Sequence, residues 1–256
     1  MVRANHLKRR ILADEPTVGC WLFMGSAASA EILSHCGYDA LLIDHEHSPG
    51  GLETAVDQLR AIAPTPTTTL VRLGDNIAAP VKQVLDAGAE GIVAANIEDA
   101  DTLDGLVSAA LYPPLGRRGA HFTVSRAARW GLDGDAYAER AAEELLVVAM
   151  IESAAGVAAI PELAKVRHVD MFFIGPLDLS ASIGLMGRYA DPAFVELLDE
   201  AERRTREAGI VLGGATMPGH DAAALFGRGY RFVTTASDVG LLRDGGLQMA
   251  QPALHC

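Results

Sequence analysis

Short apolar runs rich in β-branched residues alternate with alanine-rich amphipathic segments along the whole chain. The apolar runs are typical of β-strands, and the segments between them repeat apolar residues at helical spacing. Strands are predicted at residues 17–23, 39–46, 67–73, 91–97, 145–152, 169–175, 209–216 and 230–236. Helices are predicted at residues 27–36, 51–62, 76–87, 98–111, 154–166, 192–208, 219–227 and 238–249.

Several of the predicted helices end in a glycine just before the next strand, as in "SHCGYDALL", "LDAGAEGIV" and "REAGIVLGG". Glycine readily takes the left-handed conformation that closes a helix and turns the chain back. Repetition of this unit along the chain predicts parallel strands joined by crossover helices. An open doubly wound sheet is the alternative, but no glycine-rich dinucleotide loop follows the first strand. We therefore predict one α/β domain over residues 1–256, a closed (β/α)8 TIM barrel.

Residues 112–134, "YPPLGRRGAHFTVSRAARWGLDG", form a segment that is too long for a plain connection. Loops of this length inside a compact domain are usually functional. The segment carries Arg117, Arg118, Arg126 and Arg129. Two interpretations stay open, an anion-attracting lid and a solvated surface loop or subunit contact.

Composition and charge exclude several classes of protein. The net charge is −12 and no basic stripe with interleaved aromatic residues is present, so nucleic acid is not an expected partner. No stretch approaches the roughly 20 uncharged apolar residues of a membrane helix, so no membrane association is expected. The first residues, "MVRANHLKRRILADEPTVG", lack the apolar run of a secretory signal, and we expect a cytoplasmic protein.

In barrels of parallel strands the chemistry lies at the C-terminal ends of the strands. A lone carboxylate or serine at such a position is commonly a helix N-cap, and Ser153 and Asp238 fit that interpretation. The predicted ends taken together nevertheless bring Glu, Asp, Arg and His around one mouth, which favours a functional site. These ends carry Trp21, Asp44, His45, Glu46, His47, Arg72, Asn96, Glu152, Asp178, Thr216 and Asp238.

These residue types suit chemistry at the carbon next to a carbonyl group. Glu152 and Asp178 offer hard oxygen ligands for Mg²⁺ or Mn²⁺, completed by water and a 2-oxo acid. Arg72 offers a fixed fork for a carboxylate or an enolate oxygen. A histidine supplies a proton acceptor near neutral pH, and the backbone N–H groups of "GPLDL" can receive a carboxylate.

Lysine usage separates two routes to such an enolate. A barrel aldolase can use a lysine Schiff base in place of a metal. The chain has only three lysines, Lys8, Lys82 and Lys165, and none falls at the C-terminal end of a predicted strand. The metal-dependent route is therefore favoured.

Six stretches of the chain carry a resemblance to a known family. They are "LLIDHEHSPGG", "VRLGDN", "VLDAGAEGI", "YPPLGRRG", "AMIES" and "FFIGPLDLSASIG". The chain resembles the HpcH/HpaI family of metal-dependent pyruvate aldolases over nearly its full length. The "GP-x-DLS" and "ID-x-EH" segments, in this order and separation, are the specific part of the resemblance.

The resemblance implies a role for each matching residue. It makes His47 the catalytic base, Arg72 the group that stabilises the enolate, and Glu152 and Asp178 the ligands of Mg²⁺, Mn²⁺ or Co²⁺. Asp86 would reach the histidine of a neighbouring subunit and raise its basicity. The remaining positions are implied to orient His47 or to line the substrate site: Asp44, Glu46, Trp21, Met150, Gly175, Pro176 and Leu177.

The resemblance also implies a reaction and an assembly. A 4-hydroxy-2-oxo acid would be cleaved reversibly to pyruvate and an aldehyde by a homotrimer or homohexamer, with the helix at 238–249 in subunit contacts. Many members carry Gln where this chain has Met150, and Pro-Met where it has Ala95-Asn96, so the aldehyde stays open. Two alternatives remain, a lyase of citryl- or malyl-CoA thioesters and a non-catalytic barrel that binds a small acid.

Overall fold

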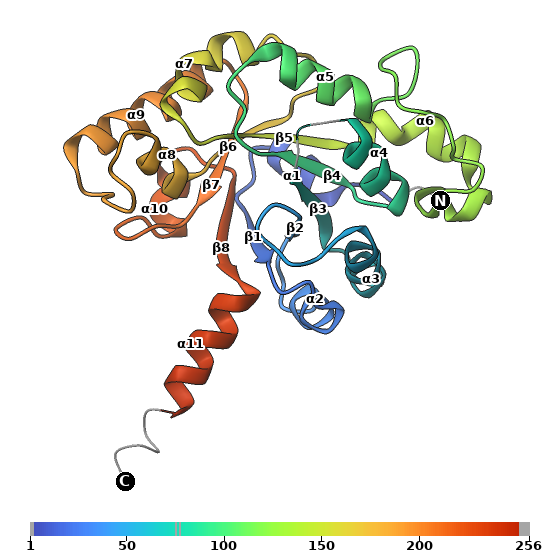
Figure 1. Cartoon of the computed structure of the whole chain (residues 1–256), viewed down its shortest axis with the longest axis horizontal. Helices are drawn as coiled ribbons and strands as arrows, with labels where there is room; N and C mark the ends of the chain where they lie inside the picture. The colour runs from blue at the N-terminus through green and yellow to red at the C-terminus, as the bar shows by residue number, and fades with distance from the viewer. Residues whose placement is uncertain (1–2, 75, 77, 251–256) are drawn as a thin grey trace.

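Eight parallel strands close into a single barrel and pair in chain order, with the last strand returning to the first (Figure 1). The computed structural model describes residues 3–74, 76 and 78–250. The closed barrel of parallel strands confirms the predicted (β/α)8 fold. The strands are β1 (Thr17–Leu22), β2 (Ala40–Asp44), β3 (Thr68–Leu73), β4 (Gly91–Ala94), β5 (Leu146–Ile151), β6 (Met171–Ile174), β7 (Val211–Ala215) and β8 (Phe232–Ser237).

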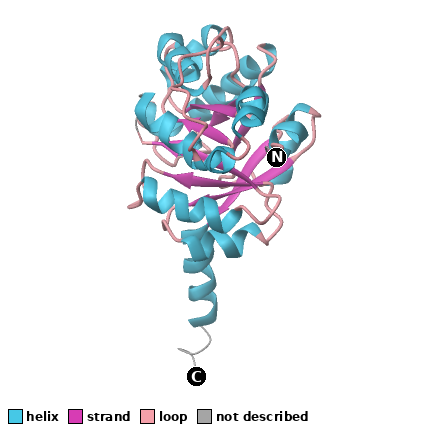
Figure 2. Ribbon diagram, turned by 90° about the vertical axis from the view of Figure 1, so that its right-hand side faces the viewer, coloured by secondary structure: helices cyan, strands magenta, loops and turns pink. Residues whose placement is uncertain are grey.

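Helices surround the strands on the outside (Figure 2). They are α1 (His6–Leu12), α2 (Ala27–Ser34), α3 (Leu52–Ile62), α4 (Ala78–Ala87), α5 (Ala100–Ala110), the 3-10 helix η1 (Arg126–Gly131), α6 (Gly134–Glu144), α7 (Ala154–Leu163), α8 (Pro176–Ser182), α9 (Pro192–Glu207), α10 (Ala222–Gly227) and α11 (Asp238–Ala250). Within the described ranges, no helix has both the length and the apolar character that a membrane span requires.

Alternate residues of each strand point into the barrel, as the twofold repeat of a strand requires. In β5, Leu146, Val148 and Met150 belong to the apolar cluster inside the barrel, whereas Val147 packs in the cluster beneath the outer helices. The next inward position of this series is Glu152, directly after the strand. The alternation that builds the core therefore also aims a carboxylate into the mouth.

Helix α1 closes the N-terminal end of the barrel. Leu7 and Ile11, one helical turn apart, pack in the interior cluster. Asn5 caps the helix by accepting a hydrogen bond from the Lys8 backbone N–H at 2.9 Å. The Lys8 ammonium donates to the Leu145 carbonyl at 2.6 Å, at the start of β5. Helix α1 thus covers the N-terminal end of the barrel, and the C-terminal ends of the strands remain available for a functional site.

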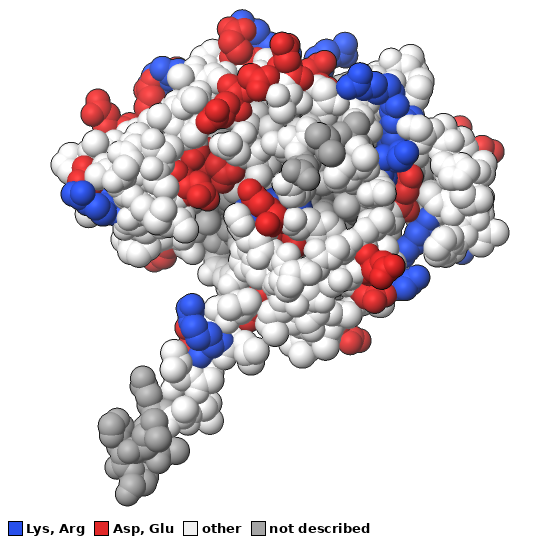
Figure 3. Space-filling model, viewed as in Figure 1, with Lys and Arg blue, Asp and Glu red and all other residues white. Residues whose placement is uncertain are grey.

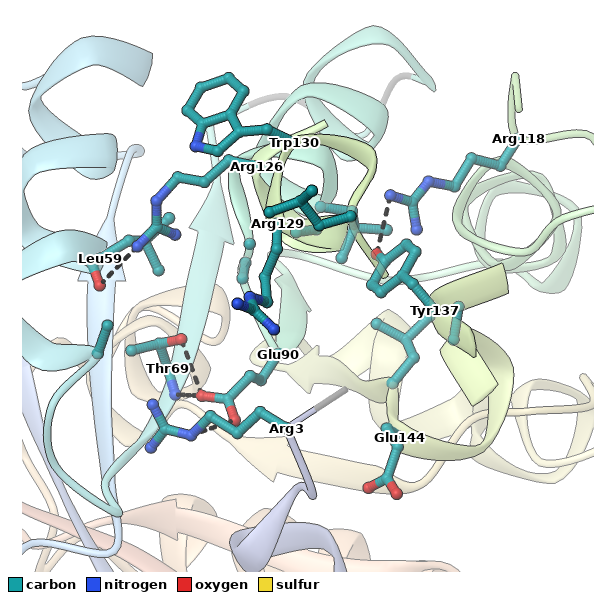
Figure 4. Close-up of a pocket in the computed structure, with 18 residues that line it drawn as sticks. Arg3, Leu59, Thr69, Glu90, Arg118, Arg126, Arg129, Trp130, Tyr137 and Glu144 are labelled. Carbon is teal, nitrogen blue, oxygen red and sulfur yellow. Dashed lines mark hydrogen bonds and ion pairs between the residues drawn. The ribbon is translucent and has the colours of Figure 1, made fainter. Parts of the chain in front are cut away.

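The segment at 112–134 binds the closed end of the barrel. Arg118 pairs with Asp86 near the end of α4, and Arg126 donates to the carbonyls of Ala87 and Leu59 at the ends of α4 and α3. Figure 4 shows these arginines around a cavity of about 420 Å³. The described contacts of the segment therefore favour the surface-loop or subunit-contact interpretation, since they do not place it over its own mouth.

Helix α11 extends away from the barrel instead of folding back against it (Figures 1 and 2). Its surface is mostly free of charge, apart from side chains near its base (Figure 3). Leu242 is 65% exposed and Met249 is 79% exposed, and Leu241 and Leu247 are exposed as well. A soluble monomer rarely leaves a large apolar helix face uncovered.

Candidate active site

Arg72 lies near the end of β3, at the mouth of the barrel. Its Nε donates to Asp44 Oδ1 at 2.6 Å, and its Nη1 lies 3.0 Å from Glu46 Oε2. The guanidinium and the Asp44 carboxylate are both almost fully buried. A charge-assisted pair of this kind fixes the orientation of the guanidinium.

Two aromatic rings face the same guanidinium. Arg72 Cζ lies 4.5 Å from the centroid of the Trp21 ring and 5.9 Å from that of Phe23. The two rings are stacked with centroids 5.7 Å apart. Trp21 near the end of β1 and Phe23 directly after it are alternate residues, and both belong to the interior side of the barrel.

The chain turns at Asp44, and the predicted strand at 39–46 is wrong at this end. The Asp44 carboxylate accepts hydrogen bonds from the backbone N–H groups of Glu46 and His47, at 3.2 and 2.8 Å. An aspartate that binds the backbone two and three residues ahead stabilises a turn in place of a strand. His45 and His47 consequently lie in a turn and do not share the face of a regular strand.

The two histidines have different surroundings. The His47 side chain is 63% exposed, and its Nε2 lies 3.7 Å from Glu46 Oε2. The His45 Nε2 is buried and has no hydrogen-bond partner among the described residues. Burial lowers the pKa of His45, although the nearby charge of Asp44 opposes this effect. Of the two rings, that of His47 is the more exposed.

Glu152 follows β5 and is only 6% exposed. Its Oε1 accepts a hydrogen bond from the Asn96 backbone N–H at 2.6 Å. Burial raises the pKa of Glu152 to about 7, with the like charges of Asp178 and Glu46 adding to the rise and the Asn96 N–H opposing it. A buried carboxylate next to other carboxylates is stabilised by a cation, so this pair fits a divalent metal.

The donor set has the chemistry of a hard, open site. Among residues 3–74, 76 and 78–250, no group of three or more His, Cys, Asp and Glu is arranged to enclose a metal ion. The carboxylates of Glu152 and Asp178 are the candidate oxygen ligands, and water and substrate would have to fill the other positions. Such a site suits Mg²⁺ or Mn²⁺ better than a metal that prefers nitrogen and sulfur ligands.

Helix α8 begins beside this pair. Gly175 is its N-cap and offers no side-chain hydrogen bond, and Pro176 occupies the first turn without an N–H group. The N–H groups of Leu177 and Asp178 have no acceptor within the helix itself. A β-carbon at Gly175 would lie 2.6 Å from Glu152 Oε2, so glycine is needed for this close approach.

Asp86 is not brought to the mouth of its own chain. It lies one residue before the end of α4, where the helix has returned to the closed end of the barrel. There its Oδ1 accepts a hydrogen bond from Arg118 at 2.6 Å. A role for Asp86 in the reaction therefore requires the mouth of another copy.

Two of the polar residues at the strand ends cap backbone groups. Ser153 caps α7 by accepting from the Gly156 N–H at 3.0 Å. Asp238 is the first residue of α11, and its carboxylate accepts hydrogen bonds from the backbone N–H groups of Phe23 and Met24. Ser153 is thus confirmed as an N-cap, whereas this interpretation is wrong for Asp238: the Gly240 N–H in the first turn of α11 donates to Ser237 Oγ at 3.0 Å, and Asp238 binds the segment that follows β1.

Sequence reasoning missed one neighbour of Arg72 and one neighbour of Trp21. Phe23 was assigned to the first strand but given no role, although it is the next inward position after Trp21. Thr234, in the interior of β8, accepts a hydrogen bond from Trp21 Nε1 at 3.1 Å. The alternation of inward positions could have found Phe23, whereas the contact with Thr234 depends on the closure of the barrel.

The fold and the mouth together define a (β/α)8-barrel enzyme with an acidic site around a buried arginine. Comparison with known proteins agrees with this class. The family described as HpcH/HpaI aldolase/citrate lyase matches residues 17–245, and the chain belongs to that family. It is thus an enzyme of a family of carbon–carbon lyases.

Its relatives include curated aldolases of similar length. The 4-hydroxy-2-oxo-heptane-1,7-dioate aldolase of Shigella sonnei is 36% identical over 93% of this chain and 90% of its own length. The hydroxypyruvate/pyruvate aldolase of Pseudomonas aeruginosa is 34% identical over 93% and 88%. The crystal structure of an HpcH/HpaI aldolase/citrate lyase family protein from Burkholderia cenocepacia J2315 superposes with a TM-score of 0.91 at 35% identity, covering 98% and 99% of the two chains.

Proposed function

We propose that the protein is a class II aldolase, which reversibly cleaves a 4-hydroxy-2-oxo acid to pyruvate and an aldehyde through the enolate of pyruvate. One observation carries the proposal: Arg72, held by Asp44 and Glu46, lies at the same mouth as the carboxylates of Glu152 and Asp178. A fixed cation beside a pair of metal-binding carboxylates suits a reaction that develops negative charge on an oxygen.

Glu152 and Asp178 would hold the metal ion, for which Mg²⁺, Mn²⁺ and Co²⁺ all fit two carboxylates and water. When bound, the metal supplies Lewis-acid polarisation of the 2-oxo acid, which makes the methyl protons of pyruvate more acidic. The hydrogen bond from the Asn96 N–H to Oε1 of Glu152 orients the buried carboxylate.

Other groups at the mouth bind the pyruvate carboxylate, stabilise the enolate and transfer the proton. The N–H groups of Leu177 and Asp178 at the start of α8 receive the pyruvate carboxylate. Arg72 uses Nε and Nη1 on its carboxylate partners, so Nη2 can donate to the enolate oxygen. His47, at the exposed turn after β2, moves a proton to or from the methyl carbon.

The walls of the site are apolar. Met150 is buried at the inner end of the mouth, and a β-carbon at Gly175 would meet the Met150 methyl at 3.4 Å. This wall offers the 2-oxo acid van der Waals contact and no further hydrogen bond from a side chain at position 150. The geometry does not select one aldehyde, so the proposal names the substrate class.

The first test avoids the unknown aldehyde. The protein is incubated with pyruvate in D₂O, with Mg²⁺ or with EDTA, and loss of the methyl proton signal is followed by NMR. We expect exchange that requires both protein and Mg²⁺, because enolate formation exchanges the methyl protons. Exchange that survives EDTA would contradict the metal dependence.

The same experiment separates the alternatives. A lyase of CoA thioesters or a barrel that only binds a small acid would leave free pyruvate unchanged under every metal. A subsequent assay with citryl-CoA or malyl-CoA would then distinguish these two. Cleavage of either thioester without exchange of pyruvate would replace the proposed function.

We infer that the enzyme acts as a homo-oligomer. Helix α11 leaves the barrel with Leu241, Leu242, Leu247 and Met249 exposed, and a second copy is a partner that would cover this apolar face. The Asp86 carboxylate, at the closed end of its own barrel, is then available to the mouth of another copy. The family resemblance favours a trimer or a hexamer.

A further inference from the structure

The carboxylate partners of Arg72 contact its nitrogen atoms, whose N–H groups point outward in the plane of the guanidinium. Asp44 and Glu46 lie on or after β2 and draw Nε and Nη1 towards that strand. A hydrogen bond and an ion pair made in the plane leave both faces of the guanidinium without support, and an arginine side chain has many rotamers. A contact to the face of the guanidinium is needed to hold Nη2 in one direction.

Trp21 supplies this contact from β1. Its ring centroid lies 4.5 Å from Arg72 Cζ, within the range of a favourable interaction between a cation and an aromatic face. The indole is itself fixed on three sides. Its Nε1 donates to Thr234 Oγ1 at 3.1 Å, Phe23 stacks on it, and the ring of Phe173 meets it edge-on with centroids 6.1 Å apart.

We propose that Trp21 is a positioning residue, locked in place by the hydroxyl of Thr234, which holds the guanidinium of Arg72 at the angle that stabilises the enolate. This proposal rests on the proposed function and deepens it. The family resemblance implies that Trp21 lines the substrate site, whereas the geometry points to Arg72 as the group through which it acts. Thr234 lies inside β8 and is buried, and its hydroxyl accepts from the indole and donates to the Gly214 carbonyl at 3.5 Å, so it is tied to Trp21 and not to the reacting atoms.

A role of Trp21 in positioning Arg72 and a role in contacting pyruvate predict different kinetics. An interaction that matters only as charge develops lowers kcat when it is lost, whereas an interaction with bound pyruvate raises KM. Trp21→Leu removes the aromatic face and should lower the kcat of methyl exchange about 10-fold or more, a cation–π contribution at a desolvated site. KM for pyruvate and the affinity for Mn²⁺ should change little.

Two milder variants keep the fold. Trp21→Phe retains an aromatic face but loses the hydrogen bond, so it should recover part of the kcat that Trp21→Leu loses. Thr234→Val removes the acceptor of the indole N–H while keeping the volume of the side chain, and its kcat should fall between those of the wild type and Trp21→Leu.

Thr69→Val is the matched control. Thr69 is as buried as Thr234 and also forms a side-chain hydrogen bond, with Glu90, but it lies at the start of β3 near the closed end of the barrel. The control variant should lose stability as Thr234→Val does and keep the kcat of the wild type.

The experiment measures kcat and KM for methyl exchange of pyruvate in D₂O with Mg²⁺, using the full chain of the wild type and of the four variants, alongside their thermal unfolding. The proposal is supported if kcat is lowest in Trp21→Leu, intermediate in Trp21→Phe and Thr234→Val, and unchanged in Thr69→Val. Unchanged kcat in a folded Trp21→Leu, a rise in KM alone, or an equal loss in Thr69→Val would each overturn it. Absence of exchange in the wild type would overturn the proposed function, and this role of Trp21 with it.

Discussion

His45 and His47 are only two residues apart, but their rings lie in different environments. The His45 ring is half-buried, its Nε2 has no partner in the described part of the chain, and burial lowers its pKa. The His47 ring is exposed beside Glu46. The assignment of the base to His47 thus stays a prediction that the geometry of the turn favours.

His47→Ala should lower the rate of methyl exchange by about 10²- to 10⁴-fold, the usual contribution of a general base. The affinity for Mn²⁺, measured by calorimetry, should stay near that of the wild type because Glu152 and Asp178 are untouched. His45→Ala serves as the control and should keep most of the exchange activity. If His47→Ala is as active as the wild type, the base must be assigned to another group.

The thiol of Cys20 should be unreactive in the folded protein. Burial in β1 raises the pKa of this thiol to about 12, so at pH 8 only about one molecule in 10⁴ carries the thiolate. Cys36 is exposed at the end of α2. Iodoacetamide at pH 8 should therefore modify Cys36 in the native protein, and Cys20 only after denaturation, as mapped by peptide mass spectrometry. Modification of Cys20 at a comparable rate in the native protein would contradict its burial.

At the scale of elements, the sequence predicts the strands better than their ends. An apolar run such as "LLVVAMIE" marks a buried strand, and glycine marks the end of a helix, because each depends on local chemistry. The end of β2 depends on the Asp44 carboxylate, which binds the backbone ahead of it. Helices α1, α6 and α8 were not predicted, and two of them, of seven residues each, are too short for a periodic pattern.

The junction of β6 and α8 should tolerate no β-carbon at Gly175. Gly175→Ala would place that carbon 2.6 Å from Glu152 Oε2 and 3.0 Å from Glu152 Cβ, so the carboxylate must move. We expect the affinity for Mn²⁺ to fall about 10-fold or more, because ligand geometry governs binding at a site with few protein ligands. Gly227→Ala, where no atom lies within 4 Å of the new carbon, is the control and should bind Mn²⁺ as the wild type does. Equal affinities for both variants would remove Glu152 from the metal site.

At the scale of the whole molecule, closure of the barrel is what creates the site. Arg72, Trp21 and Thr234 come from β3, β1 and β8, and only the pairing of β8 with β1 brings Thr234 to the indole. The sequence predicts the barrel, and therefore that the strand ends meet, but it does not predict which side chains touch. The pairing of Asp86 with Arg118 is a tertiary contact of the same kind.

Assembly should be as necessary for activity as closure of the barrel. Leu242→Glu combined with Leu247→Glu places two charges on the exposed face of α11, and burial of these charges against a second copy is unfavourable. Light scattering should then show a mass near the 26.9 kDa of one chain, with loss of most of the exchange activity. Met186→Glu changes an exposed apolar residue outside α11 and should leave mass and activity unchanged. A fully active monomer would contradict the requirement for a second copy.

A mixing experiment tests whether Asp86 is the reason that activity requires a second copy. Asp86→Asn and His47→Ala should each be weakly active alone, since each lacks one of the two groups in every site. If Asp86 of one copy acts on His47 of another, subunits exchanged at equal amounts combine both intact groups in roughly a quarter of the sites. Activity should therefore rise on mixing. If Asp86 acts within its own chain, or serves only to hold Arg118, no exchanged subunit carries both groups in working order and mixing restores nothing.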